Sequence, residues 1–280
     1  MVVVVSSVKR YINDWKRIIA VALWAVACFG FLTANASAQT ADGKLSDAWL
    51  ATLQQDTLQP GDPPLAWSHA FALQLSTATA LESQRTRLIH ELEGAMLGAS
   101  VVGNTALAAG LEAWRNTLQE VPALPGRTPG RHDLPWLGAN LRHDPPLSRV
   151  QHWGYCEVPS WIEIWHYHGI SRLAWRSGMS LDDALSTLAP NAYRHAEQAV
   201  IIAPNGVQTS RGISAWNHQT TPLSPGGRVV LMLPSDGALS AAVQREVSII
   251  NQRLPAYLAT RLPGDACRLH SAGEEGRAVR

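Results

Sequence analysis

The spacing of apolar residues predicts a helical region between residues 70 and 121. Apolar residues recur there every three to four positions, with charged residues between them. Small residues at 98–103 divide the region, so we predict a helical hairpin over 70–121, two antiparallel helices joined by a short loop. The apolar positions are Leu73, Leu81, Leu88, Leu92 and Met96 in the first helix, and Leu107, Leu111, Trp114, Leu118 and Val121 in the second.

From residue 150 the apolar period becomes two, which indicates strands. Residues 161–169 are rich in aromatic and β-branched side chains, and a capped helix is predicted at 180–185. Short apolar runs at 199–203 and 228–233, with a Pro-Asn-Gly turn after the first, predict further strands. The order strand, strand, helix, strand, strand, strand is that of a ubiquitin-like α+β domain, which we assign to 150–235.

The last part of the chain predicts one more helix. Within 236–263, an apolar stripe at helical spacing predicts an amphipathic helix, and Pro255 would kink or restart it. Its members are Val243, Val247, Ile250, Leu254 and Leu258. Residues 264–280 are polar, and we expect them to be a disordered tail. The Pro-, Gly- and Arg-rich stretch 124–146 is expected to be loop with one strand near 136–141.

The N-terminus has the pattern of a secretory signal peptide. Four basic residues (Lys9, Arg10, Lys16 and Arg17) precede an apolar run at 18–32. Ala36-Ser37-Ala38 then supplies the small residues of a cleavage site, so we predict a signal peptide over 1–38, cleaved after Ala38. The alternatives are a retained membrane anchor, for which the run is short, and a lipidated Cys28. Cleavage predicts an exported, periplasmic protein.

Composition excludes several classes of protein. Hydrophobic residues make up 46% of the 280 residues and charged residues 16%, which is too apolar for a disordered chain. Removal of 1–38, with its four basic residues and Asp14, would leave 242 residues with a net charge of −2. Neither this charge nor any dense basic run favours a nucleic-acid partner. Cys156 and Cys267 would remain, and the sequence leaves open whether they pair.

Signatures of catalysis and of cofactor binding are missing from the sequence. It has no nucleophile elbow, zinc-protease motif or phosphate-binding loop, and we expect no enzyme activity and no cofactor. His166 and His168 lack an obvious third ligand, so we expect no metal site. The candidate ligand-binding residues are Arg127, Arg131 and Trp136, because an arginine on a stiff loop can present its donors to an anionic or hydroxyl-rich ligand.

The order of these features resembles the capsule-biosynthesis GfcC family of Gram-negative bacteria. The closest piece is Ala199-Val-Ile-Ile-Ala-Pro-Asn-Gly206, followed by Ala215-Trp216-Asn217. The stretch Asn251–Pro263 resembles the C-terminal amphipathic helix of the family, and the hairpin, the Gly-Arg loop and Asp144-Pro-Pro-Leu147 occur in the family's order. The similarity spans roughly 45–263.

The resemblance implies two β-grasp (ubiquitin-like, SLBB-related) domains. The first, over 39–149, would carry the inserted helical hairpin, and the second would occupy 150–235. The family's cleft arginine follows a glycine after the hairpin; Arg131 fits by its distance to the next strand and Arg127 by its distance to the helix. The family begins with a β-hairpin for which residues 39–44 are too short. The first domain is therefore expected to be truncated at its start, or completed by strand addition from a partner.

Three functions follow as hypotheses. The first is a non-enzymatic periplasmic factor for capsule or exopolysaccharide assembly or export, with polysaccharide or the outer-membrane export machinery as partner. The C-terminal helix would be a contact surface. The alternative is a carbohydrate-binding module that contacts the polymer through the Arg/Trp loop. The third, an enzyme of polysaccharide processing, would need two convergent carboxylates, for which only Asp133 and Asp144 are candidates.

Overall fold

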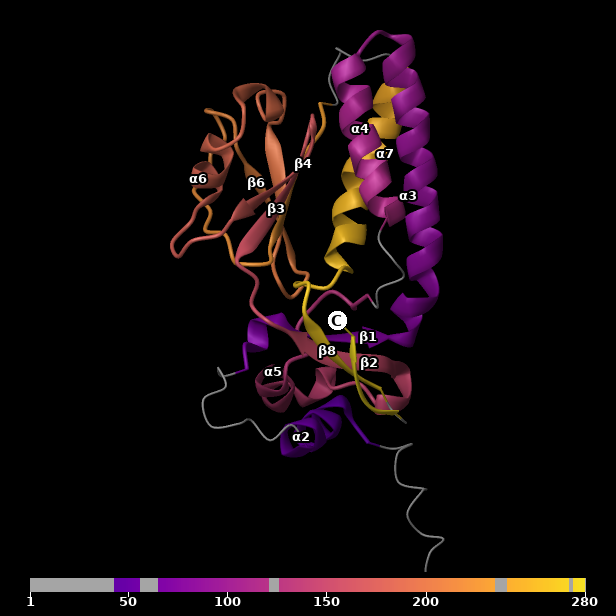
Figure 1. The fold of residues 1–280 in the computed structure, drawn as a ribbon, viewed down its shortest axis with the longest axis vertical. Coiled ribbons are helices and arrows are strands. Elements are labelled where there is room, and N and C mark those ends of the chain that lie inside the picture. The colour runs from indigo at the N-terminus through magenta and orange to yellow at the C-terminus, as the bar shows by residue number, and fades with distance from the viewer. Residues whose placement is uncertain (1–42, 56–64, 121–125, 235–240, 272–273, 280) are drawn as a thin grey trace, which may run out of the picture. The chain divides into compact units, whose positions relative to one another are not determined.

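The computed structural model describes residues 43–55, 65–120, 126–234, 241–271 and 274–279 (Figure 1). The chain divides into two units, Met1–Gly43 and Lys44–Arg280, and the helices and strands described here belong to the second. That unit is α+β, with two separate sheets. The expected signal peptide at 1–38 lies outside the described residues. None of the described helices is long and apolar enough to cross a membrane.

Three long helices lie side by side in Figure 1: α3 (Leu75–Val101), α4 (Thr105–Glu120) and α7 (Ala241–Ala259). Asn104 begins α4 by accepting the backbone N–H of Leu107 on its side-chain oxygen, 3.1 Å away. The five apolar positions predicted for the last helix are all buried. The helical hairpin begins later than predicted, because 70–74 form a strand that holds Leu73. Val121, the last apolar position predicted for the hairpin, lies outside the described residues.

A five-stranded sheet is built from one continuous part of the chain. Its strands are β3 (Trp161–His166), β4 (Gly169–Ala174), β5 (Gln198–Ile202), β6 (Gln208–Gly212) and β7 (Arg228–Leu231). They lie in the order β4-β3-β7-β5-β6, and only β3 and β7 run parallel. The short helix α6 (Leu181–Ser186) follows β4 and begins at a capping box in which Ser180 and Asp183 bond each other's backbone N–H.

The two faces of this sheet bury different cores. Trp165, Ile202 and Val230 face the long helices, and they share one cluster with Leu88, Trp114 and Val247. Ile164, Ala199 and Val229 face the other way and share a second cluster with Leu181 and Leu185 of α6. The alternation of strand side chains explains why these strands read as nearly continuous apolar runs, since both faces are covered.

A four-stranded sheet is built from distant parts of the chain. Its order is β1 (Ala70–Gln74), β2 (Val150–Cys156), β8 (Cys267–Ser271) and β9 (Glu274–Val279), with neighbouring strands antiparallel. The disordered tail expected at 264–280 is therefore wrong, because its residues pair with β2. The boundary at 150 is also wrong, because β2 belongs to this sheet and not to the five-stranded one.

A disulfide fastens the last strands to this sheet. Cys156 ends β2 and Cys267 begins β8, and the two are directly opposite each other in the strand register and bonded. The pairing that the sequence left open is thus resolved. The strands added to β1 and β2 come from the chain's own C-terminal segment, so the structure does not need a partner to supply them.

Short helices cover the outer face of the four-stranded sheet. Helix α2 (Leu45–Gln55) and helix α5 (Leu134–Ala139) contribute Trp49 and Leu137 to a cluster with Val150 and Trp153. The prediction of a strand near 136–141 is wrong, because residues 134–139 form α5. Asp133 caps this helix by accepting the Trp136 N–H at 3.0 Å. Single turns of 3-10 helix lie at Trp67–His69, Leu141–His143, Leu147–Arg149 and Pro190–Ala192.

Candidate functional site

The three residues predicted to bind a ligand do not form one surface. The Arg127 side chain is 1% exposed, and its Nε donates to the Ala259 carbonyl at 3.0 Å, at the end of α7. Burial, and secondarily repulsion from Arg228, holds the Arg127 pKa well below its usual range. Arg127 thus joins the loop after α4 to the end of α7.

Arg131 lies on the surface, but its charge is already paired. Its Nε and Nη2 donate to the two carboxylate oxygens of Asp133, both at 2.9 Å. These bonds raise the Arg131 pKa. Trp136 is half-buried and its ring centroid lies 5.3 Å from that of His143. A ligand at this loop would compete with Asp133 for the guanidinium.

The two acidic residues considered for catalysis have structural partners. Asp133 caps α5 and pairs with Arg131, as described above. Asp144 accepts the Ser46 hydroxyl at 2.6 Å and the Ser46 N–H at 3.2 Å, which fixes the start of α2. Both are buried. Each carboxylate has a structural role, because Asp133 stabilises the start of α5 and Asp144 stabilises the start of α2.

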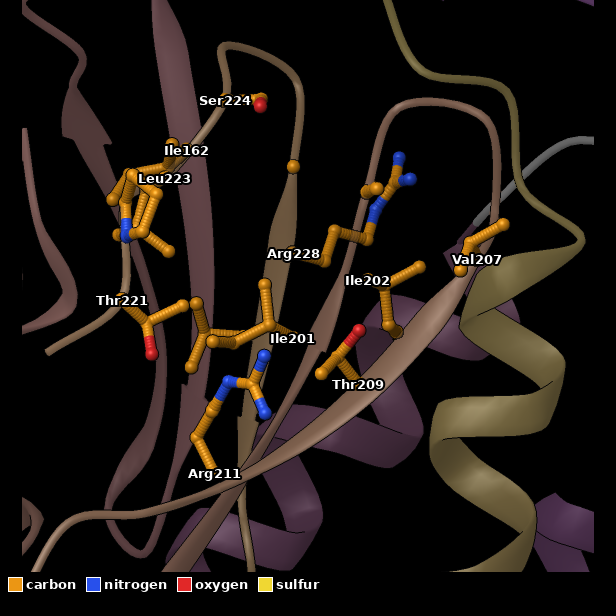
Figure 2. Close-up of a pocket in the computed structure, with 14 residues that line it drawn as sticks. Ile162, Ile201, Ile202, Val207, Thr209, Arg211, Thr221, Leu223, Ser224 and Arg228 are labelled. Atoms are coloured by element: carbon orange, nitrogen blue, oxygen red, sulfur yellow. The ribbon is translucent and has the colours of Figure 1, made fainter. Parts of the chain in front are cut away.

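A hollow opens on the α6 side of the five-stranded sheet (Figure 2). Its volume is about 160 Å³, and its floor includes Ile162, Ile201 and Val229. One side is formed by β6, with Thr209 and Arg211, and the other by the segment 221–224. No residue of α6 lines it, because this helix has only six residues and covers part of the sheet. No motif or spacing in the sequence singles out Arg211.

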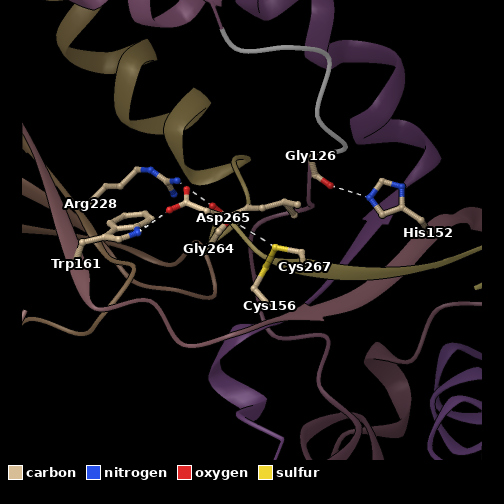
Figure 3. Close-up of a disulfide and its surroundings, with 9 residues drawn as sticks. Gly126, His152, Cys156, Trp161, Arg228, Gly264, Asp265 and Cys267 are labelled. Carbon is tan, nitrogen blue, oxygen red and sulfur yellow. Dashed lines mark hydrogen bonds between the residues drawn. A yellow bond between two sulfur atoms is a disulfide. The ribbon is translucent and has the colours of Figure 1, made fainter. Parts of the chain in front are cut away.

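A buried ion pair lies where the five-stranded sheet meets the C-terminal segment. Figure 3 shows one member, Arg228, near Trp161 and Asp265. Arg228 Nε lies 3.3 Å from Glu163 Oε1, and both side chains are about 5% exposed or less. Burial alone would raise the Glu163 pKa, but Arg228, Arg261 and Arg172, with the Trp165 N–H, outweigh it, and the pKa is lowered. Burial lowers the Arg228 pKa to about 10.

This ion pair is connected to the segment that leads to the disulfide. Arg228 Nη2 donates to the Leu262 carbonyl at 2.9 Å, and Arg172 and the Trp161 indole N–H bond the Asp265 carboxylate. The segment between α7 and β8 is therefore held against the start of β3 before it reaches Cys267. Glu163 could have been singled out from the sequence, because it is a charged residue inside the apolar run Trp-Ile-Glu-Ile-Trp, and a buried charge needs a partner.

Two serine–histidine contacts bear on the question of catalysis. His166 Nδ1 accepts the His168 N–H at 3.3 Å, so its Nε2 carries the proton and donates to Ser171 Oγ at 2.9 Å. His166 therefore cannot act as a base toward Ser171. His69 Nε2 faces the Pro225 carbonyl at 3.1 Å, which leaves Nδ1 to accept from Ser68 Oγ at 3.0 Å. This second contact has the direction that an activated hydroxyl requires.

Histidines do not assemble a metal site in the part of the chain that the structure describes. His166 ends β3 and His168 lies in the turn after it, so the two histidines do not share a strand face. Across residues 43–279, with the gaps given above, no three His, Cys, Asp or Glu side chains form a group that could hold a metal ion.

The comparison with family models gives a match over most of the five-stranded sheet and α7. Residues 169–263 match the model described as capsule biosynthesis GfcC C-terminal, which runs from β4 to the end of the segment after α7. The resemblance seen in the sequence is thus confirmed over these residues. A search of curated proteins found no match.

Proposed function

We propose that this chain, which carries a GfcC-family C-terminal domain at residues 169–263, is a non-enzymatic periplasmic factor for the assembly or export of capsule or exopolysaccharide. The observation that carries the proposal is this family match, which relates the chain to capsule biosynthesis. The match covers four strands of the sheet that holds the hollow (β4, β5, β6 and β7) and helix α7, which Arg127 contacts.

The strand order supports a β-grasp domain that consists of β3 and the matched residues. Strands β3 and β7 run parallel at the centre of the order β4-β3-β7-β5-β6, and α6 lies on one face. This is the arrangement expected when a helix crosses the sheet between two pairs of antiparallel strands. We extend the proposal to the four-stranded sheet, whose β1 and β2 would be the remnant of a first, truncated β-grasp domain.

The disulfide supports export of the protein. Bonds such as Cys156–Cys267 persist in oxidising compartments and are rare where thioredoxin and glutathione keep thiols reduced. Together with the signal-like N-terminus, this favours the periplasm, with cleavage after Ala38. The apolar face of α7 is buried, so a protein partner would meet its exposed polar residues, including Arg245, Ser248 and Gln252.

A deletion strain tests the function. Loss of the gene should lower surface polymer, while intracellular polymer is unchanged or accumulates, because the proposed step follows synthesis. Expression of the intact chain in the same strain should restore surface polymer. Normal surface and intracellular amounts in the deletion strain would contradict the proposal.

The alternative function, polymer binding through the Arg/Trp loop, is favoured by the 48% exposed Arg131 side chain, which bonds the same Asp133 carboxylate as the Trp136 backbone N–H. It predicts that polysaccharide quenches Trp fluorescence and that Arg131→Ala abolishes the quenching. Quenching that survives the substitution would exclude this loop as the contact.

Absence of catalysis is tested at the Ser68–His69 contact. We expect the purified protein to release no reducing ends from capsular polysaccharide. Release by the intact protein, lost in Ser68→Ala and retained in the control Ser83→Ala on α3, would overturn the non-enzymatic proposal.

A further inference from the structure

The hollow beside β6 has the form of a small ligand site. Its volume of about 160 Å³ is several times the ~30 Å³ that one water molecule occupies in the liquid. Its floor is apolar, because Ile162, Ile201 and Val229 belong to the core on the α6 face. Apolar surfaces with a few converging polar groups are typical of sites for small molecules.

Hydroxyl groups stand at the sides of this floor. Thr209 pairs with Ile201 in the strand register, so both side chains lie on the same face. Ser224 is on the opposite side of the hollow. Within the described residues, neither the Thr209 nor the Ser224 hydroxyl has a protein partner, and both can bond a ligand. An apolar floor with hydroxyls at its sides matches a sugar ring, which has an apolar face and peripheral hydroxyls.

Arg211 adds a positive charge that nothing nearby neutralises. It pairs with Ala199 across the strands and therefore lies on the same face as Thr209 and Ile201. Its Nη1 donates a long hydrogen bond to the Ser210 carbonyl, 3.4 Å away. In the described part of the chain, no carboxylate pairs with Arg211, and none of the lining residues is acidic. Guanidinium groups bind carboxylates through two parallel bonds, so this site favours an acid.

We propose that this hollow binds an acidic sugar residue, with the ring on the Ile201 floor and the carboxylate on Arg211. The inference deepens the proposed function and rests on it for the source of the sugar, a polysaccharide that contains uronate units. It places polymer contact on the five-stranded sheet instead of the Arg131 loop, where Asp133 already occupies the guanidinium.

Chemical shifts of the purified protein test the site. The probes are methyl glucuronide, methyl glucoside and inorganic phosphate, each added to millimolar concentration. We expect glucuronide to shift the backbone amides of Ile201, Thr209 and Arg211, and to bind about tenfold more tightly than glucoside. Arg211→Gln should remove about tenfold of the affinity for glucuronide, and the exposed Arg149→Gln should leave it unchanged.

Thr209→Val keeps the shape and the charge but removes one hydroxyl, so it should weaken binding several-fold even if Arg211→Gln does not fold. No shifts at these amides, equal affinities of glucuronide and phosphate, or equal effects of Arg211→Gln and Arg149→Gln would overturn the inference. A strain deleted for the gene that loses surface polymer, while the protein binds no glucuronide, would refute this site and leave the proposed function standing.

Discussion

The two sheets of this protein contain similar strands but are assembled in different ways. The five-stranded sheet uses one continuous part of the chain, residues 161–231, and its longest-range pairing, β3 with β7, joins Glu163 and Arg228, which are 65 residues apart. The four-stranded sheet joins 70–74, 150–156 and 267–279. Long-range pairing requires closure of large loops, which costs conformational entropy. The comparison indicates that the four-stranded sheet depends on a covalent cross-link, which the Cys156–Cys267 disulfide supplies.

Removal of this disulfide should have the largest effect on stability. Cys156 and Cys267 are 111 residues apart, so opening their loop should lower the free energy of unfolding by roughly 4–5 kcal/mol. Urea unfolding of Cys156→Ser/Cys267→Ser measures this loss, and reductant should not change the double variant further. Hydrogen exchange should show β8 exposed while β5 and β7 stay protected. Equal loss of protection in both sheets would break the distinction between them.

Glu163→Gln should have the next largest effect, because it leaves Arg228 buried without a counter-charge. Loss of one partner of a buried pair costs about 3–5 kcal/mol. Since Arg228 also holds the Leu262 carbonyl, the substitution should loosen the segment that leads to β8. The control is Glu112→Gln. Glu112 pairs with Arg115 at the surface, so this substitution should lower the free energy of unfolding by less than about 1 kcal/mol. Similar losses in the two variants would contradict this role.

Acid should destabilise the five-stranded sheet through His166. Burial, and secondarily His168, lowers the His166 pKa to about 4 from an ordinary 6.5. The unfolded chain then binds more protons than the folded chain between these values, so stability falls as pH drops from 6.5 to 4. His166→Gln should remove up to about 3 kcal/mol of this dependence in urea titrations. An unchanged pH dependence would show that His166 does not titrate in this window.

Gly110→Ala should have the smallest destabilising effect and tests how closely α4 approaches the five-stranded sheet. A Cβ at Gly110 would clash with the Tyr167 carbonyl, so we expect a loss of about 1–2 kcal/mol despite the better helix propensity of alanine. Gly94→Ala on α3 is the matched control, with its nearest neighbour 3.9 Å away, and should be neutral or stabilising by up to about 1 kcal/mol. Melting temperatures distinguish them; equal shifts would mean that α4 is not in close contact.

The sequence predicted the contiguous sheet better than the composite one. Alternation, the Ser180 cap and the turn residues near 204 are local signals, and they indicated β3, α6, β5 and β7. They did not indicate β4, and the strand predicted from residue 150 belongs to the other sheet. The polar segment 267–271 has no such signal, because its pairing with β2 depends on a contact more than 100 residues away. Tertiary contacts, and not the local sequence pattern, therefore determine that this segment forms a strand.

The candidate site shows the same limit. The Gly-Arg spacing drew attention to Arg127 and Arg131, but whether an arginine is buried, paired or free depends on neighbours that the sequence does not reveal. Arg127 meets the end of α7, Arg131 meets Asp133, and Arg211 lies beside the hollow without an acid. The sequence has 11 tryptophans, and the structure explains part of this number: Trp114 and Trp175, for example, donate indole N–H bonds to carbonyls of distant segments.

The composite sheet depends on one covalent bond, and the proposed export of the chain predicts that this bond forms in the cell. Alkylation of the protein taken directly from cells, denatured without reductant and followed by mass spectrometry, measures its state. We predict that Cys156 and Cys267 resist alkylation until reductant is added, and that the mature chain begins at Gln39. Two freely alkylated thiols in the cellular protein would contradict the account.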